Sequence, residues 1–204
     1  MNIILAFAFP LAGYLFGSLP FAIWITRLVK GVDVRNAGSG HATTTNTIRQ
    51  AGFVAGVSVF ILDVAKGFLP TWLALHYAPA EWKAWIAPLT AGLAVAGHCW
   101  PIFAQFRGGM GLACAGGCLL VSSPLAFLLS TVILISLTLA LHHSARASVF
   151  TGLLAAPFLW LFGLRDLTLW IAIALGLVIA FRFLVDWNRK YRELWLDRNE
   201  QGEH

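Results

Sequence analysis

The sequence predicts an all-α, polytopic membrane protein with about seven spans, forming a single integral membrane domain over residues 1–204. Hydrophobic residues make up 59% of the 204 residues and charged residues 11%, and the mean hydropathy is +0.77. A soluble domain carries about 25% charged residues, so this chain has too few polar side chains to cover a water-facing surface. The same composition excludes a disordered chain. The apolar runs are long and continuous, not alternating, which favours helices over a transmembrane β-barrel.

The first predicted span, residues 2–29, is interrupted by Gly17-Ser18-Leu19-Pro20. Its apolar stretch is longer than that of a signal peptide and lacks a clear small-residue cleavage site, so we expect a span that is not cleaved. A polar, glycine-rich segment follows at residues 30–52. Further spans are predicted at residues 53–77, 82–103, a short one ending near 122, 124–141, 148–164 and 166–185, followed by a short cytoplasmic tail at 187–204 that lies as a helix at the membrane interface.

The basic residues are distributed unevenly over the predicted connections, and this bias predicts the orientation in the membrane. With the N-terminus outside, eleven of the 14 Lys and Arg residues fall in inner segments, two (Lys83 and Arg165) in outer turns, and one (Lys66) within a span. We therefore expect an outer N-terminus, a cytoplasmic C-terminus, and every glycine-rich polar segment on the cytoplasmic side. The net charge of +5 then reflects helix ends beside anionic lipid headgroups, and no nucleic-acid partner is expected.

The three cysteines, Cys99, Cys114 and Cys118, are an odd number in apolar surroundings, which argues against a disulfide framework. Cys114 and Cys118 have no histidine or acid beside them. We interpret them as small packing residues and expect no metal site. His142 and His143 are adjacent and would point about 100° apart on a helix, which does not suit a bidentate metal site. We expect both of these side chains to face solvent.

Residues 33–49 have the composition of an anion-binding loop. Gly38 and Gly40 let the backbone turn its N–H groups inward, and the hydroxyl groups of this segment donate hydrogen bonds. Arg35 and Arg49 can pair with phosphate in bidentate fashion. An ordinary loop with good turn-forming residues has the same composition, and both interpretations stay open at this point.

Two further features suit such a site. Residues 97–111 carry glycines ahead of a predicted helix, where they either cradle an anion or allow a tight turn between two membrane helices. His98 in this segment is either a general base or an ordinary hydrogen-bonded histidine. Asp63 and Lys66 lie three residues apart in an apolar span, where ionisable side chains pair with each other or face a polar cavity.

Four segments, in this order and spacing, resemble the bacterial acyl-phosphate–glycerol-3-phosphate acyltransferases, which are small seven-span membrane enzymes of phospholipid synthesis. Gly17-Ser18-Leu19-Pro20 looks like the family's first-span motif, and Asp63-Val64-Ala65-Lys66-Gly67 looks like its second-span motif. Residues 33–49 are similar to its signature loop, and residues 97–111 are similar to its Gly-His…Pro…Phe-Lys-Gly-Gly-Lys-Gly segment. The resemblance covers about the whole chain.

By this resemblance the protein is expected to transfer an acyl group from acyl phosphate to the sn-1 hydroxyl of glycerol 3-phosphate. The products are lysophosphatidic acid and free phosphate. The resemblance implies no cofactor, no metal and no acyl-CoA. It implies a multi-pass protein of the bacterial inner (plasma) membrane, whose partners are glycerol 3-phosphate, acyl phosphate, membrane lipid and the enzyme that makes acyl phosphate.

The resemblance also implies roles for individual residues. Ser39 and Arg49 are expected to hold phosphate and align the acceptor, and together with His98 they form the expected catalytic set. Asp33 and Asp63 are expected to be structural. The expected substrate-binding residues are Arg35, Gly38, Gly40, His41, Asn46, Lys66, Arg107, Gly108 and Gly109.

The chain departs from the family pattern at several positions. Met110 stands where the family has the lysine of Gly-Gly-Lys-Gly, and the loss of one charge-assisted phosphate contact predicts roughly 10- to 100-fold weaker binding or slower transfer. His41 replaces an asparagine in the signature loop. In the last span, Phe183 replaces a histidine and Asp186 an asparagine. Arg107 and a protonated His41 are the side chains expected to replace the missing charge.

Two other functions remain open from the sequence alone. One is a catalytically degenerate paralog that binds a lipid or a partner in the same scaffold, which Met110, Phe183 and Asp186 favour. The other is a small membrane transporter, because Asp63 and Lys66 are also the kind of residues that a permeation path uses.

Overall fold

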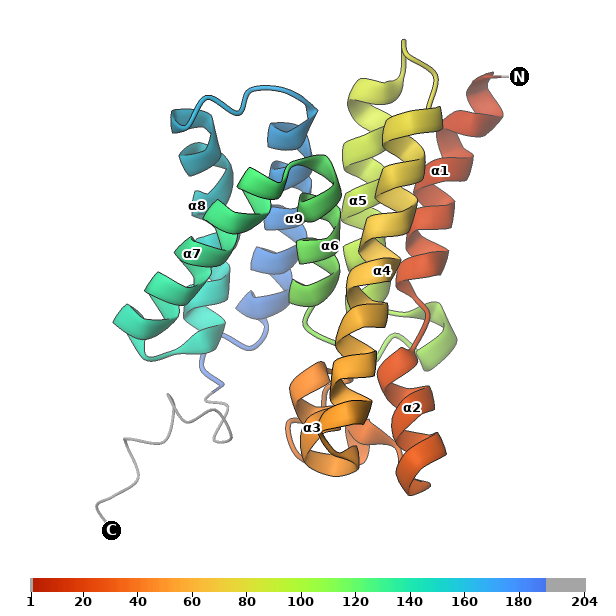
Figure 1. The fold of residues 1–204 in the computed structure, drawn as a ribbon, viewed down its shortest axis with the longest axis vertical. Helices are drawn as coiled ribbons and strands as arrows, with labels where there is room; N and C mark the ends of the chain where they lie inside the picture. Colours follow the sequence, from red (N-terminus) through yellow and green to blue (C-terminus); the bar gives the residue numbers. More distant parts are fainter. Residues whose placement is uncertain (1, 190–204) are drawn as a thin grey trace.

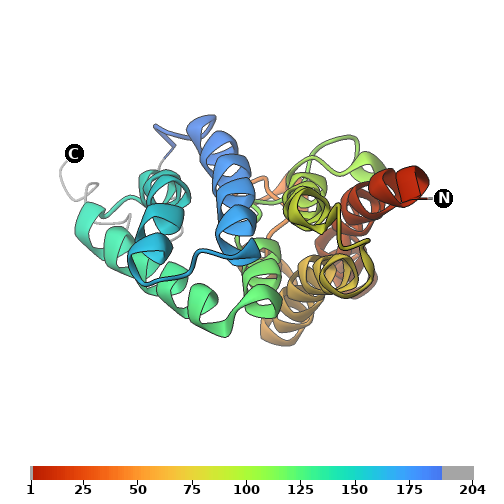
Figure 2. The ribbon, with the colours of Figure 1, turned by 90° about the horizontal axis from the view of Figure 1, so that it is seen from above.

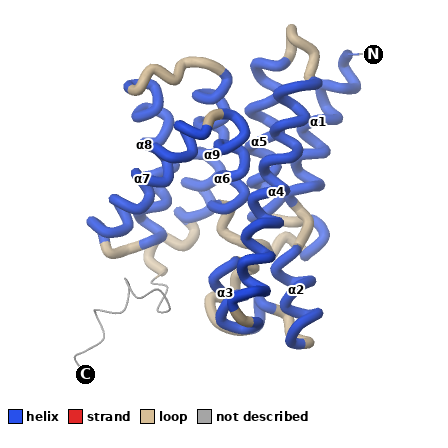
Figure 3. The backbone as a smooth tube through the Cα atoms, viewed as in Figure 1, coloured by secondary structure: helices blue, strands red, loops and turns tan. Residues whose placement is uncertain are grey.

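The computed structural model describes residues 2–189, and over this range the chain folds into nine α-helices joined by short connections (Figures 1 and 3). Two 3-10 turns, Val34–Asn36 and Ile102–Ala104, lie in the two polar loops. The helices are α1 (Asn2–Gly17), α2 (Phe21–Lys30), α3 (Thr44–Ala51), α4 (Phe53–Tyr77), α5 (Lys83–Cys99), α6 (Leu112–Ser122), α7 (Pro124–Leu141), α8 (Ser144–Leu161) and α9 (Leu167–Leu184).

Six segments of the described chain are long and apolar enough to cross a membrane, which confirms the predicted all-α, multi-pass fold class. α6 is the exception. Its 11 residues make a helix about 16 Å long, which is shorter than the bilayer's hydrocarbon core of about 30 Å. The expected seven spans therefore become six full-length spans and one short helix. The six are Ala6–Lys30 (α1 and α2 together), Phe53–Tyr77, Lys83–Ala104, Pro124–Leu141, Ser144–Leu161 and Leu167–Leu184.

The helices form two groups that lie side by side, with α6 between them (Figures 1 and 2). α1, α4 and α5 pack together in one group, α7, α8 and α9 form the other, and both α5 and α6 contact α9. The N-terminus lies at one end of the molecule (Figure 1). α2, α3, the loop before α6 and the C-terminal end of α9 gather at the opposite end, here called the loop end. The segments for which the sequence predicts a common side of the membrane thus lie together.

The start of α8 differs from the sequence expectation. The helix begins at Ser144, four residues before the predicted span. His142 ends α7 in the left-handed conformation with φ 49°, and His143 caps α8, because its Nδ1 accepts a hydrogen bond from the backbone N–H of Arg146 at 3.5 Å. His142 is exposed but His143 is buried, so the expectation that both face solvent is wrong for His143. Of the predicted tail helix, residues 190–204 lie outside the described residues.

Glycines allow the closest helix contacts. A Cβ atom added at Gly176 of α9 would collide with the backbone carbonyl of Gly152 on α8, and one at Gly117 of α6 would collide with the carbonyl of Val64 on α4. Membrane helices associate through such close backbone packing because lipid provides no hydrophobic drive between them. Cys118 packs in the same way, since its thiol donates to the carbonyl oxygen of Gly67 at 3.4 Å.

An alanine at Gly176 is expected to force α8 and α9 apart, at a cost of about 1–3 kcal/mol in unfolding free energy. The measurement is the midpoint of thermal unfolding in detergent. Gly92→Ala is the matched control, because its Cβ would lie an ordinary 3.4 Å from the Cβ of Ala174, and this variant should keep or raise the midpoint. Equal midpoints for Gly176→Ala and the wild type would contradict the close contact.

Candidate active site

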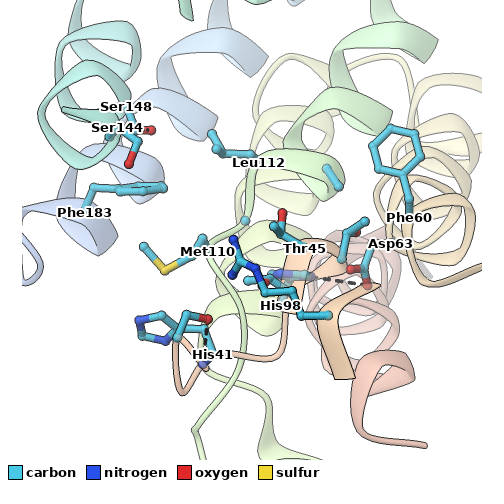
Figure 4. Close-up of a pocket in the computed structure, with 16 residues that line it drawn as sticks. His41, Thr45, Phe60, Asp63, His98, Met110, Leu112, Ser144, Ser148 and Phe183 are labelled. Carbon is cyan, nitrogen blue, oxygen red and sulfur yellow. Dashed lines mark hydrogen bonds and ion pairs between the residues drawn. The ribbon is translucent and has the colours of Figure 1, made fainter. Parts of the chain in front are cut away.

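A cavity of about 340 Å³ lies towards the loop end. In Figure 4, Phe60 and Asp63 stand on one side of it, and Ser144, Ser148 and Phe183 stand on the other. Its polar lining consists of Ser39, His41, Thr43, Thr44, Thr45, Arg49, Asp63, His98, Ser144 and Ser148. Its apolar and glycine lining consists of Phe60, Met110, Gly111, Leu112, Ala113 and Phe183.

Asn46 holds the loop of residues 33–49 in shape. Its side-chain amide is fully buried and donates to the backbone carbonyls of Val34, Ala37 and His41 at 2.8, 3.0 and 3.1 Å. Buried carbonyls need such donors, because leaving one unpaired costs about as much as a lost hydrogen bond. Gly38 has φ +62°, and any Cβ there would collide with Oδ1 of Asn46. The loop therefore needs both residues to present its backbone to the cavity.

An ion-pair cluster fastens the start of this loop to the connection between α5 and α6. Asp33 accepts hydrogen bonds from Arg27 at 2.7 Å and from the Arg35 side chain at 2.8 and 3.0 Å. The hydrogen bonds from Arg35 lower the pKa of Asp33 to about 2. Arg35 also donates to the carbonyl oxygen of Ala104 at 2.8 Å. Asp33 and Arg35 thus link the two loops, and neither lines the cavity.

Three ionisable side chains, those of Asp63, Lys66 and His98, meet at the wall of the cavity. Nζ of Lys66 lies 3.0 Å from Oδ1 of Asp63 and donates to the carbonyl oxygen of Leu19 at 3.0 Å. Nδ1 of His98 lies 3.6 Å from the same Asp63 oxygen, as the dashed line in Figure 4 marks. All three side chains are at most 5% exposed. Gly109 fits against the imidazole of His98, where an added Cβ would collide with Nε2.

The departures from the family pattern meet one another in space. His41 in the loop lies 3.3 Å from Asp186, just beyond α9. Met110 and Phe183 are both buried in one hydrophobic cluster and both line the cavity. Burial and the nearby Arg182 charge lower the pKa of His41 to about 4, so His41 is neutral at pH 7. The expectation that a protonated His41 supplies positive charge is therefore wrong.

The structure separates the predicted site residues into three groups. Ser39, His41, Arg49, Asp63 and His98 line the cavity. Lys66, Gly108 and Gly109 line a small adjoining hollow of about 10 Å³ that also touches Asp63 and His98. Arg107 is exposed and lines neither space, so the structure does not place it where the missing charge would act. The residues that shape the loop without lining either space are Asp33, Arg35, Gly38, Gly40 and Asn46.

Sequence reasoning missed Ser144 and Ser148, which line the cavity from the start of α8. Their spacing of four residues puts both on one face of a helix, and this was the available signal. It also missed Arg189, which follows α9 and contacts His41 and Ser39 in the loop of residues 33–49.

Among the described residues no group of three or more His, Cys, Asp or Glu side chains is arranged to hold a metal ion.

An apolar groove lies next to the cavity, between α6, α7, α8 and α9. Its volume is about 90 Å³, and Leu112 lines both spaces. The groove is lined by Leu112, Ala115, Gly116, Leu119, Phe127, Ser130, Thr131, Leu134, Thr151, Gly152, Ala155, Ala172, Leu175, Gly176 and Ile179. A cavity with polar side chains in its wall thus adjoins an apolar groove.

Asn46→Asp is expected to lower stability by about 2–3 kcal/mol, because a carboxylate would replace the amide donor facing three carbonyl oxygens. The unfolding midpoint in detergent reports it. Asn36→Asp makes the same chemical change at an exposed position of the same loop and should leave the midpoint unchanged. A similar midpoint for both variants would show that the amide donor of Asn46 does not hold the loop.

His41 predicts a pH dependence of stability. Its pKa is about 4 in the folded protein against 6.5 for an ordinary histidine, so between these values the unfolded chain binds a proton that the folded one does not. The unfolding free energy should therefore fall as the pH drops from 7.5 to 5. His41→Asn should lose less stability than the wild type over this range, as measured by thermal unfolding at both pH values. Parallel losses would exclude a lowered pKa at His41.

Comparison with known proteins gives one consistent result. A family model described as glycerol-3-phosphate acyltransferase matches residues 7–193. A glycerol-3-phosphate acyltransferase of Aquifex aeolicus is 36% identical over 176 residues, which are 86% of this chain and 90% of that protein. One from Exiguobacterium sibiricum is 44% identical over 137 residues, which are 67% of this chain and 63% of that protein, slightly less than two thirds of its length.

Two solved structures have the same fold. One is the crystal structure of PlsY (YgiH), an integral membrane glycerol 3-phosphate acyltransferase, in its glycerol 3-phosphate form, with a TM-score of 0.76 and 35% identity over 90% of each chain. The other is the lysophosphatidic acid form of PlsY, with a TM-score of 0.75 and 34% identity over the same share of each chain.

Proposed function

Since the chain belongs to the glycerol-3-phosphate acyltransferase family, we propose that it transfers an acyl group from acyl phosphate to the sn-1 hydroxyl of glycerol 3-phosphate. The products are lysophosphatidic acid and phosphate. The observation that carries this proposal is the cavity that Ser39, Arg49 and His98 line, with an apolar groove that adjoins it at Leu112. A transfer between a phosphate-bearing donor with a long acyl chain and a small polar acceptor needs both environments side by side.

The phosphate groups of the substrates occupy the cavity, beside its polar side chains. Arg49 lines it from α3, and Ser39 lines it from the glycine-rich loop. A guanidinium group and a hydroxyl are suited to the oxygens of phosphate. The Asn46 amide fixes the loop in advance of binding, so that less ordering is needed when the substrate arrives. Ser39 and Arg49 therefore hold phosphate and align the acceptor.

The reaction balances within this cavity. The sn-1 oxygen forms an ester bond to the acyl carbon, the bond between that carbon and the phosphate oxygen breaks, and the hydroxyl proton leaves with the phosphate. His98 lines the cavity with Asp63 beside it. An imidazole with a carboxylate neighbour is a suitable group to take a proton in transit. Asp63 and Lys66 have a structural role, because their ion pair positions His98.

The acyl chain lies in the groove between α6, α7, α8 and α9, and this places the reaction at the membrane surface. The uneven distribution of basic residues supports a cytoplasmic loop end and an outer N-terminus in a bacterial inner membrane. Acyl phosphate then enters from the lipid side and glycerol 3-phosphate from the cytoplasm. The enzyme that makes acyl phosphate is the proposed partner, because it supplies the donor substrate.

The decisive experiment is the transfer itself. Purified protein in a lipid mesophase, given palmitoyl phosphate and glycerol 3-phosphate, is expected to release phosphate and form lysophosphatidic acid only when both substrates are present. Arg49→Ala should lower the rate by about 10- to 100-fold, because it removes a charge-assisted contact to phosphate. Phosphate release and lysophosphatidic acid are followed in parallel.

Arg165→Ala is the control, because Arg165 lies in the connection between α8 and α9, away from the loop end, with its guanidinium over Trp160. It should transfer at the wild-type rate. An unchanged rate for Arg49→Ala would remove Arg49 from the phosphate site. Folded wild-type protein that releases no phosphate would contradict the proposed transfer and favour a non-catalytic paralog.

A further inference from the structure

Side chains from the loop and from the end of α9 meet in a compact cluster beside the cavity. Nδ1 of His41 lies 3.1 Å from an Arg182 nitrogen, and its Nε2 lies 2.9 Å from an Arg189 nitrogen. Oδ2 of Asp186 lies 3.3 Å from the same Nε2 and accepts a hydrogen bond from Arg182 at 3.1 Å. The side chains of His41, Asp186 and Arg182 are only 13%, 12% and 10% exposed.

The hydrogen-bonding capacity of these groups determines how they fit together. A guanidinium only donates, and a neutral imidazole accepts at one nitrogen and donates from the other. His41 is neutral at pH 7, so it cannot accept from both arginines. Asp186 orients the imidazole, because its carboxylate accepts a hydrogen bond from Nε2–H and leaves Nδ1 to accept from Arg182. Arg189 is then held by the Asp186 carboxylate, 3.8 Å away, and by the backbone.

The two arginines of the cluster are tied to the substrate-binding loops. Nε of Arg182 donates to the carbonyl oxygen of Gly109 at 3.2 Å, immediately before Met110. Arg189 donates to the carbonyl oxygen of Ser39. Two guanidinium groups, one carboxylate and a neutral imidazole carry one net positive charge.

We propose, resting on the acyl transfer proposed above, that His41 and Asp186 form a coupled positioning pair. Asp186 selects the His41 tautomer, and the pair holds Arg182 and Arg189 against the loops that bind phosphate. The contacts of the two arginines with the carbonyl oxygens of Gly109 and Ser39 thereby fix the loop backbone from the end of α9. His41 and Asp186 both depart from the family pattern, and their direct contact indicates that they work as a unit.

A double-mutant cycle tests the coupling, using the wild type, His41→Asn, Asp186→Asn and the double variant. Each single variant leaves a donor or acceptor without its match and is expected to lower kcat/KM by about 10- to 100-fold, mainly through a higher KM for glycerol 3-phosphate. Two asparagine amides can pair with each other, so the double variant should be more active than either single variant. Losses that simply multiply would overturn the coupling.

Asp166→Asn is the matched control for Asp186→Asn. Asp166 caps the opposite end of α9 by accepting from the backbone N–H of Thr168 at 2.9 Å, and asparagine is an equally good cap. This variant should keep wild-type kinetics. A wild-type rate in Asp186→Asn would likewise overturn the proposal.

A second measurement separates this proposal from the proposed function. Wild-type protein without transfer activity would overturn the function but leave the pair to be tested by binding. In that case the four proteins of the cycle are compared by the rise in unfolding midpoint that glycerol 3-phosphate or inorganic phosphate produces. Protection lost in both single variants and regained in the double variant supports the pair. Equal protection in all four proteins overturns it.

Discussion

Lys66 and Asp63 pair inside α4, and the elements around the site depend on this pair. A charge buried at membrane depth costs several kcal/mol unless it is matched and hydrogen-bonded. Lys66 therefore needs both Asp63 and the carbonyl oxygen of Leu19, which fixes the chain break between α1 and α2 against α4. Asp63 in turn faces His98 on α5. One ion pair thus sets the relative positions of three helices and places the imidazole at the cavity.

The parts of the fold that were predictable from sequence are those that depend on local composition. A helix that crosses a lipid bilayer needs a long apolar run of residues, so the sequence predicts the bounds of five of the six full-length spans to within a few residues. The start of α8 was not, because His142 and His143 resemble a loop, whereas one adopts the left-handed conformation and the other caps a helix. The short α6 was recognised, but its length rules it out as a complete span.

The site was predictable only in part, for the same reason. The loop around Ser39 is recognisable in the sequence from its glycines and hydroxyl side chains. In the structure Ser39, Arg49 and His98 all line the cavity. Arg107 was expected there because it is near Met110 in the chain, yet Gln105 and Phe106 both turn with positive φ, and Arg107 is exposed beyond them. The contact between His41 and Asp186 joins distant segments, and one sequence alone carries no record of which distant side chains meet.

The hydrogen bond from Arg189 to the loop bears on how the protein can be handled in the laboratory. The segment after α9 is part of the site's own architecture, whereas the N-terminus lies at the far end of the molecule (Figure 1). A fluorophore, affinity tag or fusion partner joined near Arg189 would compete with the contacts that keep the loop in place. Attachments at the N-terminal end leave those contacts untouched, which makes that end the better handle for purification and for single-molecule work.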